Sequence, residues 1–130
     1  MAKFILSAFA DEASASLDEQ IATLKALGIS HIEPRNVDGT NVSDLTEEAA
    51  KAVRKKLDDA GIGLSSIGSP IGKVDIAGDL DEHIEKLKNT INVANILGAK
   101  YIRMFSFFVP VGHEDEYETQ VFAGMERMIE

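Results

Sequence analysis

Apolar residues along this chain follow two different spacings. Short apolar runs are typical of buried strands, whereas an apolar residue at every third or fourth position is typical of an amphipathic helix. The two patterns alternate, so the sequence predicts a βα unit that repeats along the chain. We expect strands at about 3–10, 30–35, 63–67 and 100–107. We expect helices at about 17–27, 45–60, 80–97 and 115–128.

The first three predicted helices share a signature at both ends. At the start, a residue that can cap free N–H groups precedes Leu, any residue and Glu. At the end, a glycine comes after the last turn of the helix. The capping residues are Ser16, Asp44 and Asp79, and the closing glycines are Gly28, Gly61 and Gly98.

Each predicted helix has one apolar face, which we expect to point toward the core. On this spacing His83 lies on the solvent side of the third helix. The expected inward positions are Leu17, Ile21, Leu24 and Leu27, then Leu45, Ala49, Val53, Leu57 and Ala60, then Leu80, Ile84, Leu87, Ile91 and Ala94, and finally Val121, Met125 and Met128.

The connections between the predicted elements are asymmetric. Those that enter a strand are short, whereas those that leave a strand are longer and carry most of the polar residues. Because parallel α/β folds place their sites at the carboxyl ends of the strands, we expect a site among these longer loops. The loops are Phe9–Glu12, Glu33–Val42, Gly68–Gly78 and Phe105–Glu116.

The repeat predicts a single (β/α)4 unit over residues 1–130, an α/β architecture in which parallel strands alternate with helices. An eight-stranded TIM barrel typically needs about 250 residues, so four units amount to half of one. The pattern leaves three alternatives open: half of a longer protein, two copies that pair, or a small open sheet.

Composition narrows the classes of function. The formal net charge of -9 argues against a nucleic-acid partner, since such binders are usually basic. The chain has no cysteine, which excludes disulfides and thiolate metal sites. The apolar run that ends at Ala10 is too short to span a membrane and is better explained as a strand than as a signal peptide. We therefore expect a cytoplasmic protein.

Charged residues alternate along the second predicted strand. His31, Glu33 and Arg35 face the same side, with Glu33 and Arg35 nearest the end where a site is expected. They form either an internal ion pair or contacts to substrate hydroxyls, and His31, at the other end, is structural. Arg103 in the fourth strand also needs a carboxylate or an anionic ligand, and Glu33 is its expected partner.

The segment from Gly68 to Lys73 only superficially resembles a nucleotide phosphate loop. Its spacing is short by one residue, it contains Pro70, and Val74 stands where a hydroxyl residue would hold magnesium. Two interpretations remain: free backbone N–H groups with Lys73 hold a sugar phosphate, or the segment is a plain loop.

Two acidic clusters have less specific patterns. Asp11 and Glu12 resemble the magnesium pocket of receiver domains, but this chain has Ile67-Gly68-Ser69 where such domains need an aspartate. The run from His113 to Glu116 is interpreted as a helix start rather than a metal site, because acidic residues favour that end of the helix dipole.

Four segments together resemble the sugar-phosphate isomerase/epimerase family of xylose-isomerase-like barrels. They are Ser7–Glu12, Leu24–Arg35, Ser65–Lys73 and Leu97–Ser106. The resemblance covers the N-terminal half of the family's barrel. Relatives of the endonuclease IV type place histidines after strands three and four, where this chain has Gly68-Ser69 and Phe105-Ser106, so the DNA-repair branch is disfavoured.

The resemblance implies a divalent-metal enzyme (Mn, Mg, Zn or Co) that moves a proton or hydride beside the carbonyl of a small sugar or sugar phosphate. The family's metal and acid/base residues come mostly from strands five to eight, so we expect no metal site on this chain alone. The expected substrate side comprises Glu33, Arg35, Ser69, Lys73 and Arg103. The alternative is a non-catalytic half-barrel that self-associates, as a homodimer or with a missing C-terminal half.

Overall fold

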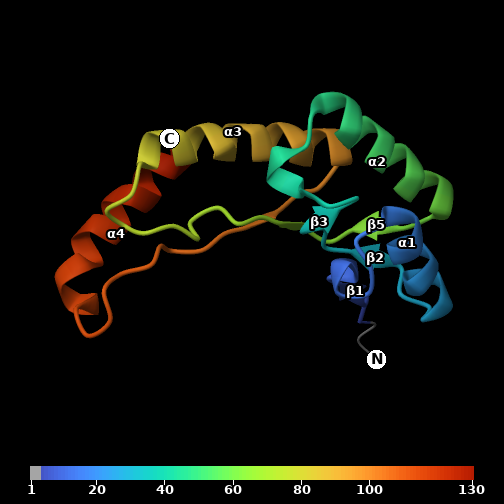
Figure 1. Ribbon diagram of the computed structural model, residues 1–130, viewed down its shortest axis with the longest axis horizontal. Coiled ribbons are helices and arrows are strands. Elements are labelled where there is room, and N and C mark those ends of the chain that lie inside the picture. Colours follow the sequence, from blue (N-terminus) through green and yellow to red (C-terminus); the bar gives the residue numbers. More distant parts are fainter. Residues whose placement is uncertain (1–3) are drawn as a thin grey trace.

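The computed structural model describes residues 4–130, and its strands and helices alternate as the sequence predicts. Figure 1 shows α2 and α3 along one side of the strands, with α4 at the end farthest from the N-terminus. The elements, in chain order, are β1 (Ser7–Ala8), η1 (Ala10–Glu12), α1 (Leu17–Ala26), β2 (His31–Ile32), β3 (Asn36–Val37), β4 (Thr40–Asn41), η2 (Val42–Asp44), α2 (Glu47–Ala60), β5 (Gly63–Leu64), β6 (Ile67–Gly68), α3 (Leu80–Leu97), β7 (Ile102–Arg103) and α4 (Glu114–Ile129).

The strands that follow one another along the chain pair in parallel. β1 pairs with β2, β2 with β5, and β6 with β7. β5 and β6 correspond to the single strand predicted at 63–67, although β6 extends one residue further, to Gly68. The strand changes its hydrogen-bonding neighbour at Ser65 and Ser66. The order is that of a partial TIM barrel, which confirms the predicted fold class. Over residues 4–130 the strands do not close into a barrel.

The strands are much shorter than the sequence pattern predicts. The first was expected at 3–10, but β1 covers only Ser7–Ala8, and Lys3 lies outside the described residues. Phe4, Ile5 and Leu6 are exposed, with 89%, 70% and 64% of their surface accessible. Apolar β-forming residues need a neighbouring strand to complete a ladder, and β1 has one only on its β2 side.

A β-hairpin occupies the region that was expected to be a polar loop, 36–43. β3 and β4 pair antiparallel, and their two-residue turn places Asp38 and Gly39 at φ 51° and 78°. Positive φ at both positions is typical of the tight hairpin turn that Asp-Gly favours. The turn also changes the start of α1, because Asp38 Oδ1 accepts a hydrogen bond from the Leu17 amide at 2.9 Å.

The predicted caps are confirmed at some helix ends and wrong at others. Asp79 caps α3, accepting from the amides of Asp81 and Glu82. Ser16 makes no capping bond to α1 with its side chain. Asp44 ends η2 instead, and Thr46 caps α2. The closing glycines Gly28, Gly61 and Gly98 all have positive φ, as expected.

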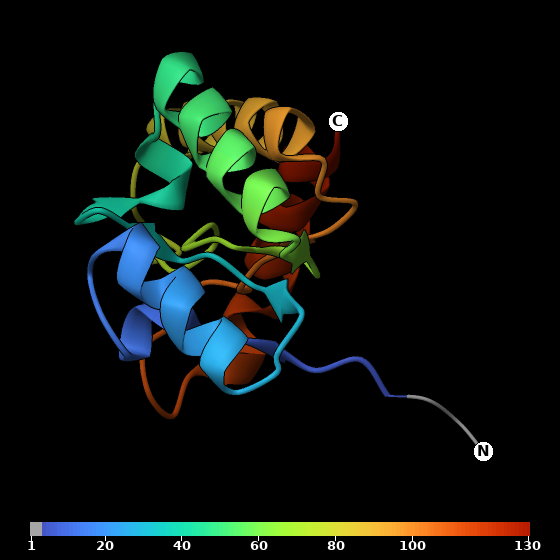
Figure 2. The same cartoon turned by 90° about the vertical axis from the view of Figure 1, so that its right-hand side faces the viewer.

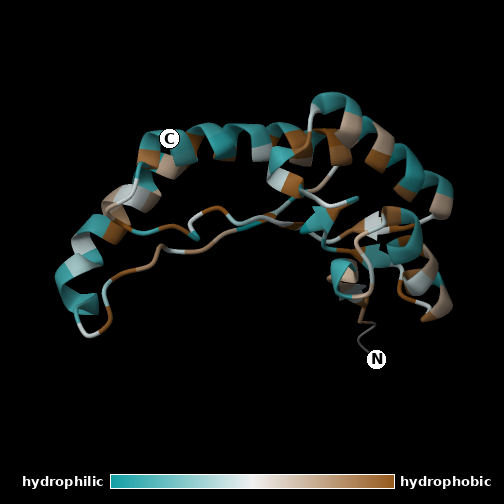
Figure 3. Ribbon diagram, in the orientation of Figure 1, coloured by the Kyte–Doolittle hydropathy of each residue, from teal (hydrophilic) through white to brown (hydrophobic). Residues whose placement is uncertain are grey.

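The main core lies between the strands and the first three helices. α1 contacts α2 and α2 contacts α3, so these helices form a continuous outer layer (Figure 2). Each long helix carries both hydrophilic and hydrophobic positions (Figure 3). The predicted face of α3 is rotated, since Ile91 is 43% exposed whereas Thr90 and Val93 are buried. The buried apolar cluster contains Ala10, Leu17, Leu24, Ile32, Val37, Val42, Leu45, Ala50, Val53, Leu57, Ile62, Ile67, Val93, Ala94 and Leu97.

The segment after β6 is paired rather than free. Its carbonyls at Ile71, Gly72 and Val74 accept hydrogen bonds, each of 2.8 Å, from the amides of residues 105, 107 and 108. Beneath it lies a second, smaller cluster of buried residues, Ile71, Leu87 and Met128. The parallel pairing of β6 and β7 thus continues into the loop, and α4 covers its far end.

Candidate functional site

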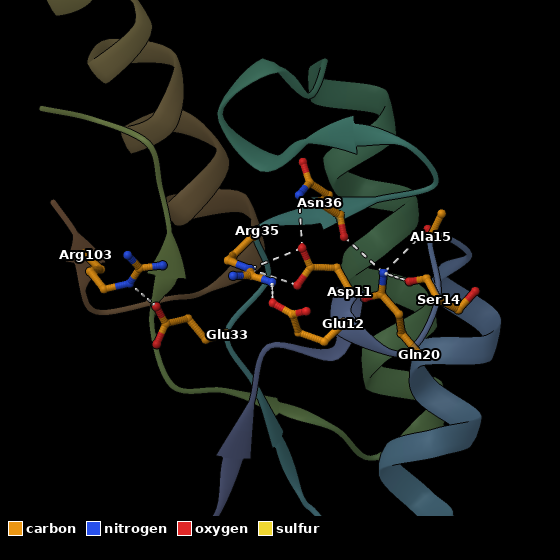
Figure 4. A network of polar contacts seen from close by, with 9 residues as sticks. All are labelled: Asp11, Glu12, Ser14, Ala15, Gln20, Glu33, Arg35, Asn36 and Arg103. Carbon is orange, nitrogen blue, oxygen red and sulfur yellow. Dashed lines mark hydrogen bonds and ion pairs between the residues drawn. The ribbon is translucent and has the colours of Figure 1, made fainter. Parts of the chain in front are cut away.

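Arg35 is held by two acidic residues that follow β1. Its Nε lies 3.0 Å from Asp11 Oδ1, and its terminal nitrogen donates to Glu12 (Figure 4). Asn36 Nδ2 donates to the other Asp11 oxygen at 3.0 Å. The hydrogen bonds to Glu12 and then to Asp11 raise the pKa of Arg35 above its ordinary value. Both acids are therefore engaged in fixing this guanidinium.

The loops on either side of α1 are tied together by Gln20, which is fully buried. Its Nε2 donates to the carbonyl of Ser14 at 2.9 Å and to that of Asn36 at 3.0 Å. Ser14 follows η1, which carries Asp11, and Asn36 begins β3. This buried amide therefore fixes the Asp11 loop against the residue that follows Arg35.

Arg103 and Glu33 pair, as the sequence predicts. Arg103 Nε donates to Glu33 Oε1 at 2.6 Å, and the two side chains are 33% and 17% exposed (Figure 4). The Arg103 guanidinium also lies over the rings of Phe9 and Phe105, each centroid 5.2 Å away. The pair joins the end of β2 to β7. Arg35 is not part of this pair. The internal ion pair between Glu33 and Arg35, one of the two interpretations of the sequence, therefore does not form.

Gly68 lets the two arginines approach each other. A Cβ at this position would lie 2.7 Å from Arg35 Cγ and 3.2 Å from Arg103 Nη2, the former closer than real Cβ contacts allow. The bare backbone at the end of β6 is thus the surface against which both side chains pack. Only glycine fits here without displacing one of them.

Ser69 is almost completely buried, and its hydroxyl has partners within the chain. The hydroxyl donates to the Arg103 carbonyl at 2.6 Å and accepts from the Ile71 amide at 3.3 Å. It fixes the loop to β7, and its expected contact with substrate stays a prediction.

The backbone N–H groups of this loop do not form a phosphate cradle. The amide of Ile71 donates to Ser69, that of Gly72 to His83, and that of Lys73 to the Pro70 carbonyl. With those donors used internally, the interpretation as an anion-binding backbone is wrong at residues 71–73. What remains for a ligand is the Lys73 side chain, which is exposed and lies over the Phe105 ring at 5.7 Å.

These side chains surround a cavity of about 350 Å³ at the carboxyl ends of the strands. Four of the five predicted residues line it, and Glu33 is linked to it through Arg103. The lining residues are Asp11, Arg35, Asn36, Asn41, Gly68, Ser69, Pro70, Lys73, Arg103 and Phe105.

Sequence reasoning missed the lining roles of Asp11, Asn36, Asn41 and Phe105. All four lie in the strand-to-helix loops where the sequence predicts a site. Their position along the chain therefore indicated them, although their residue types alone did not. Asp11 was considered only as part of a receiver-type metal pocket.

The histidines lie apart from one another. His31 Nδ1 is 2.9 Å from the Ser30 hydroxyl, and His113 Nδ1 is 3.0 Å from Glu116 Oε1 near the start of α4. The expectation for His83 is wrong, because it is 7% exposed and its Nε2 accepts from the Gly72 amide at 2.7 Å. Within residues 4–130, no group of three or more His, Cys, Asp or Glu side chains could hold a metal ion.

The site balances charge rather than concentrating it. Arg35 is matched by acids, Arg103 is matched by Glu33, and Lys73 forms no ion pair among the described residues. Amide groups from Asn36 and Asn41 add donors and acceptors at the rim. Such a mixed lining can bind a small molecule with many hydroxyls and one anionic or carbonyl oxygen near Lys73.

Comparison with known proteins identifies the family to which the fold belongs. The family model described as xylose isomerase-like TIM barrel matches residues 21–130. No match is found among curated proteins. No helix in the described part of the chain is long and apolar enough to cross a membrane. Since the family model spans most of the sequence and the parallel strand order agrees with it, the chain belongs to the xylose isomerase-like TIM barrel family.

Proposed function

We propose that this chain provides a substrate-binding side of a cytoplasmic sugar isomerase or epimerase, one that shifts a proton or hydride beside the carbonyl of a small sugar or sugar phosphate. The observation that carries the proposal is the cavity in which Arg35, Lys73 and Arg103 meet at the carboxyl ends of the strands. In parallel barrels the reacting groups come from this end.

The chemistry of the lining favours a polyhydroxylated ligand. Sugar hydroxyls both donate and accept hydrogen bonds. The two arginines supply donors, and the neighbouring asparagine amides supply both donors and acceptors. Lys73, whose ammonium lies toward Phe105, is suited to a phosphate or a carbonyl oxygen. Phe105 offers an apolar wall against which a sugar ring can pack.

The divalent metal expected for such a reaction does not fit the described residues. Asp11 and Glu12 are engaged by Arg35, and Glu33 by Arg103. No step of the proposal therefore passes through a metal held by this chain, and its ligands would lie on other strands of a complete barrel. Calorimetry with Mn²⁺ and Zn²⁺ tests this directly, and micromolar binding to the chain alone would contradict it.

Ligand titration tests the proposed substrate class. Aldose, ketose and the corresponding sugar phosphates are titrated into the chain by calorimetry, with Lys73→Ala and Arg103→Met as variants. We expect a phosphorylated sugar to bind, and we expect both variants to weaken its affinity at least tenfold.

Lys55→Ala serves as the matched control, because Lys55 pairs with Asp59 on the outer face of α2. Equal affinity in the Lys73 and Lys55 variants would contradict the proposal. Turnover with added Mn²⁺ is then measured on this chain and on a longer version.

A second candidate function is favoured by the unpaired sides of the sheet. β1 and β7 each have one neighbouring strand among residues 4–130. Phe4, three residues before β1, and Phe108 and Val111, five and eight residues after β7, are 89%, 55% and 94% exposed. Open strand edges and exposed apolar residues promote association. Leu6 and Phe105 are also exposed, while Leu64 is partly buried against the main core.

For this second candidate we propose a non-catalytic half-barrel that pairs with a second copy about a two-fold axis, β1 of one copy beside β7 of the other. Sedimentation velocity over a hundredfold range of concentration tests it, and a dimer at tens of micromolar is expected. A compact monomer throughout that range would contradict it.

A further inference from the structure

His83 is a buried hydrogen-bond acceptor for the loop that carries Lys73. Its Nε2 lies 2.7 Å from the Gly72 amide nitrogen, and the residue is 7% exposed. A backbone N–H can only donate, so Nε2 must be unprotonated and the neutral ring carries its proton on Nδ1. Protonation of Nε2 would place two donors face to face and abolish this bond.

Gly72 occupies a position where the backbone has little freedom. Its φ is +80°, and a Cβ there would lie 1.7 Å from the Phe105 carbonyl oxygen. The Gly72 carbonyl accepts from the Phe107 amide at 2.8 Å, while its own amide points to His83. Gly72 is therefore held between the segment 105–108 on one side and α3 on the other.

The residue that follows this peptide lines the cavity. Lys73 extends over the Phe105 ring, with Nζ 5.7 Å from the centroid. The hydrogen bond from Gly72 to His83 is thus one residue away from the cation that the proposed function assigns to substrate. It connects the cavity with a buried side chain on α3.

The charged groups around His83 come from its own helix and the adjoining loop. Asp79, Glu82 and Lys86 line a hollow next to it, and Asp75 in the loop accepts from the Ala77 amide. From α4, Arg127 binds Asp81 at the same end of α3, and the segment 105–108 contributes no titratable side chain. Burial, and then the charge of Lys86, lower the pKa of His83 below its ordinary value of 6.5.

We propose that His83 is a positioning residue for the cavity: in its neutral form it holds the Gly72 peptide and thereby Lys73 in place, and its protonation releases them. The effect of His83 on ligand binding rests on the function proposed above. The release of the loop on protonation of His83 does not depend on that function. Because the pKa is lowered, the stability that neutral His83 provides is complete above about pH 6.5 and is lost as the pH falls through the lowered pKa.

Nuclear magnetic resonance of the whole chain tests the proposal without a ligand. The pH is lowered from 7.5 while the His83 ring nitrogens, the Gly72 amide and the Lys73 side-chain methylenes are followed. We expect all three to change at one common midpoint below 6.5, and the Lys73 methylenes to lose the shift caused by the Phe105 ring. A Gly72 amide that stays constant while His83 titrates would overturn the proposal.

Two substitutions distinguish an acceptor from a merely space-filling residue. His83→Gln retains an acceptor without titrating, so it should keep the Gly72 amide protected and remove the pH dependence. His83→Phe fills the space without an acceptor, and the Gly72 amide should exchange at least tenfold faster. His113→Gln, at an exposed position, is the control and should alter neither. Equal exchange at Gly72 in the Phe and Gln variants would refute the role. If the loop responds as expected but sugar phosphates do not bind, only the proposed function fails.

Discussion

The region around β1, β2 and β5 and the region around β6, β7 and α4 are stabilised in different ways. The first contains most of the large apolar cluster beneath α1, α2 and the second half of α3, which also takes in Ile67 of β6. The second has a cluster of only three buried residues among those described, Ile71, Leu87 and Met128. It is held in addition by backbone pairing between 71–76 and 105–108. Both regions have paired backbone, but most of the buried apolar side chains lie in the first, so the second depends more on hydrogen bonds.

The cavity lies where these two regions meet. Asp11 and Arg35 come from the first region, whereas Lys73 and Phe105 come from the second. The Glu33–Arg103 pair crosses the boundary at 2.6 Å. A ligand in the cavity would therefore contact both regions and stabilise their relative position.

Leu57→Ala should have the largest effect, because it removes a fully buried side chain from the main cluster. We expect a loss of about 3 kcal/mol in the free energy of unfolding, as for other Leu→Ala changes in a close-packed core. Urea denaturation followed by circular dichroism measures it. A loss below about 1 kcal/mol would mean that the first region is not held mainly by burial.

Gly72→Ala tests backbone pairing in the second region. The new methyl group would overlap the Phe105 carbonyl, and positive φ is unfavourable for alanine. We expect a loss of at least about 2 kcal/mol, since a strained backbone position alone costs this order of free energy and the overlap adds to it. Hydrogen exchange should show faster opening at residues 105–108 while α1 and α2 stay protected. Uniform loss of protection would show that the two regions unfold as one unit. Gly112→Ala, which also has positive φ but open space around it, separates clash from φ strain.

Arg103→Ala tests the link between the regions. It leaves the Glu33 carboxylate without its partner at a position only 17% exposed. A fully buried pair costs several kcal/mol to break, but water reaches both side chains here, so we expect about 1.5 kcal/mol. Denaturation of Arg103→Ala and Arg103→Met, the latter retaining the aliphatic packing, separates charge from packing. If Arg103→Met is as stable as the native chain, the ion pair does not stabilise the boundary.

Met128→Ala should have the smallest effect of the four. Met128 is 8% exposed and packs in the small cluster at the end of α4. We expect about 1 kcal/mol, because in so small a cluster the neighbouring side chains can collapse into the space that the shorter side chain leaves. Exchange should rise in α4 alone. An effect as large as that of Leu57→Ala would remove the distinction between the two regions.

Several elements could be predicted from sequence because their signals are local. The closing glycines, the Asp79 cap and the helix spans depend on residues only a few positions apart. The hairpin at Asp38-Gly39 also has a local signal, the Asp-Gly turn. It was missed because the polar residues around it were interpreted as a loop. The Glu33–Arg103 pair was predictable for another reason, since Glu33 follows β2 and Arg103 ends β7, so both lie at the carboxyl ends of parallel strands.

Other features could not be predicted because they depend on residues far apart in the chain. Nothing near Ser16 indicates that Asp38 will bind the first amide of α1. The apolar spacing of α3 does not reveal that a loop will cover His83 and supply an amide to its ring. The partners of Asp11 and Glu12 likewise became clear only when Arg35 was placed between them.

The sequence by itself determined the alternation of strands and helices, the loops that carry the site and four of the ten residues that line it. Those properties follow from local spacing and from the common direction of parallel strands. Only the tertiary structure decided that the amides of residues 71–73 are used within the chain, that Asp11 and Glu12 bind Arg35, and which face of α3 is buried. The physical reason is that a hydrogen-bonding group takes the partner that folding brings nearest, and those partners lie up to 70 residues away along the chain.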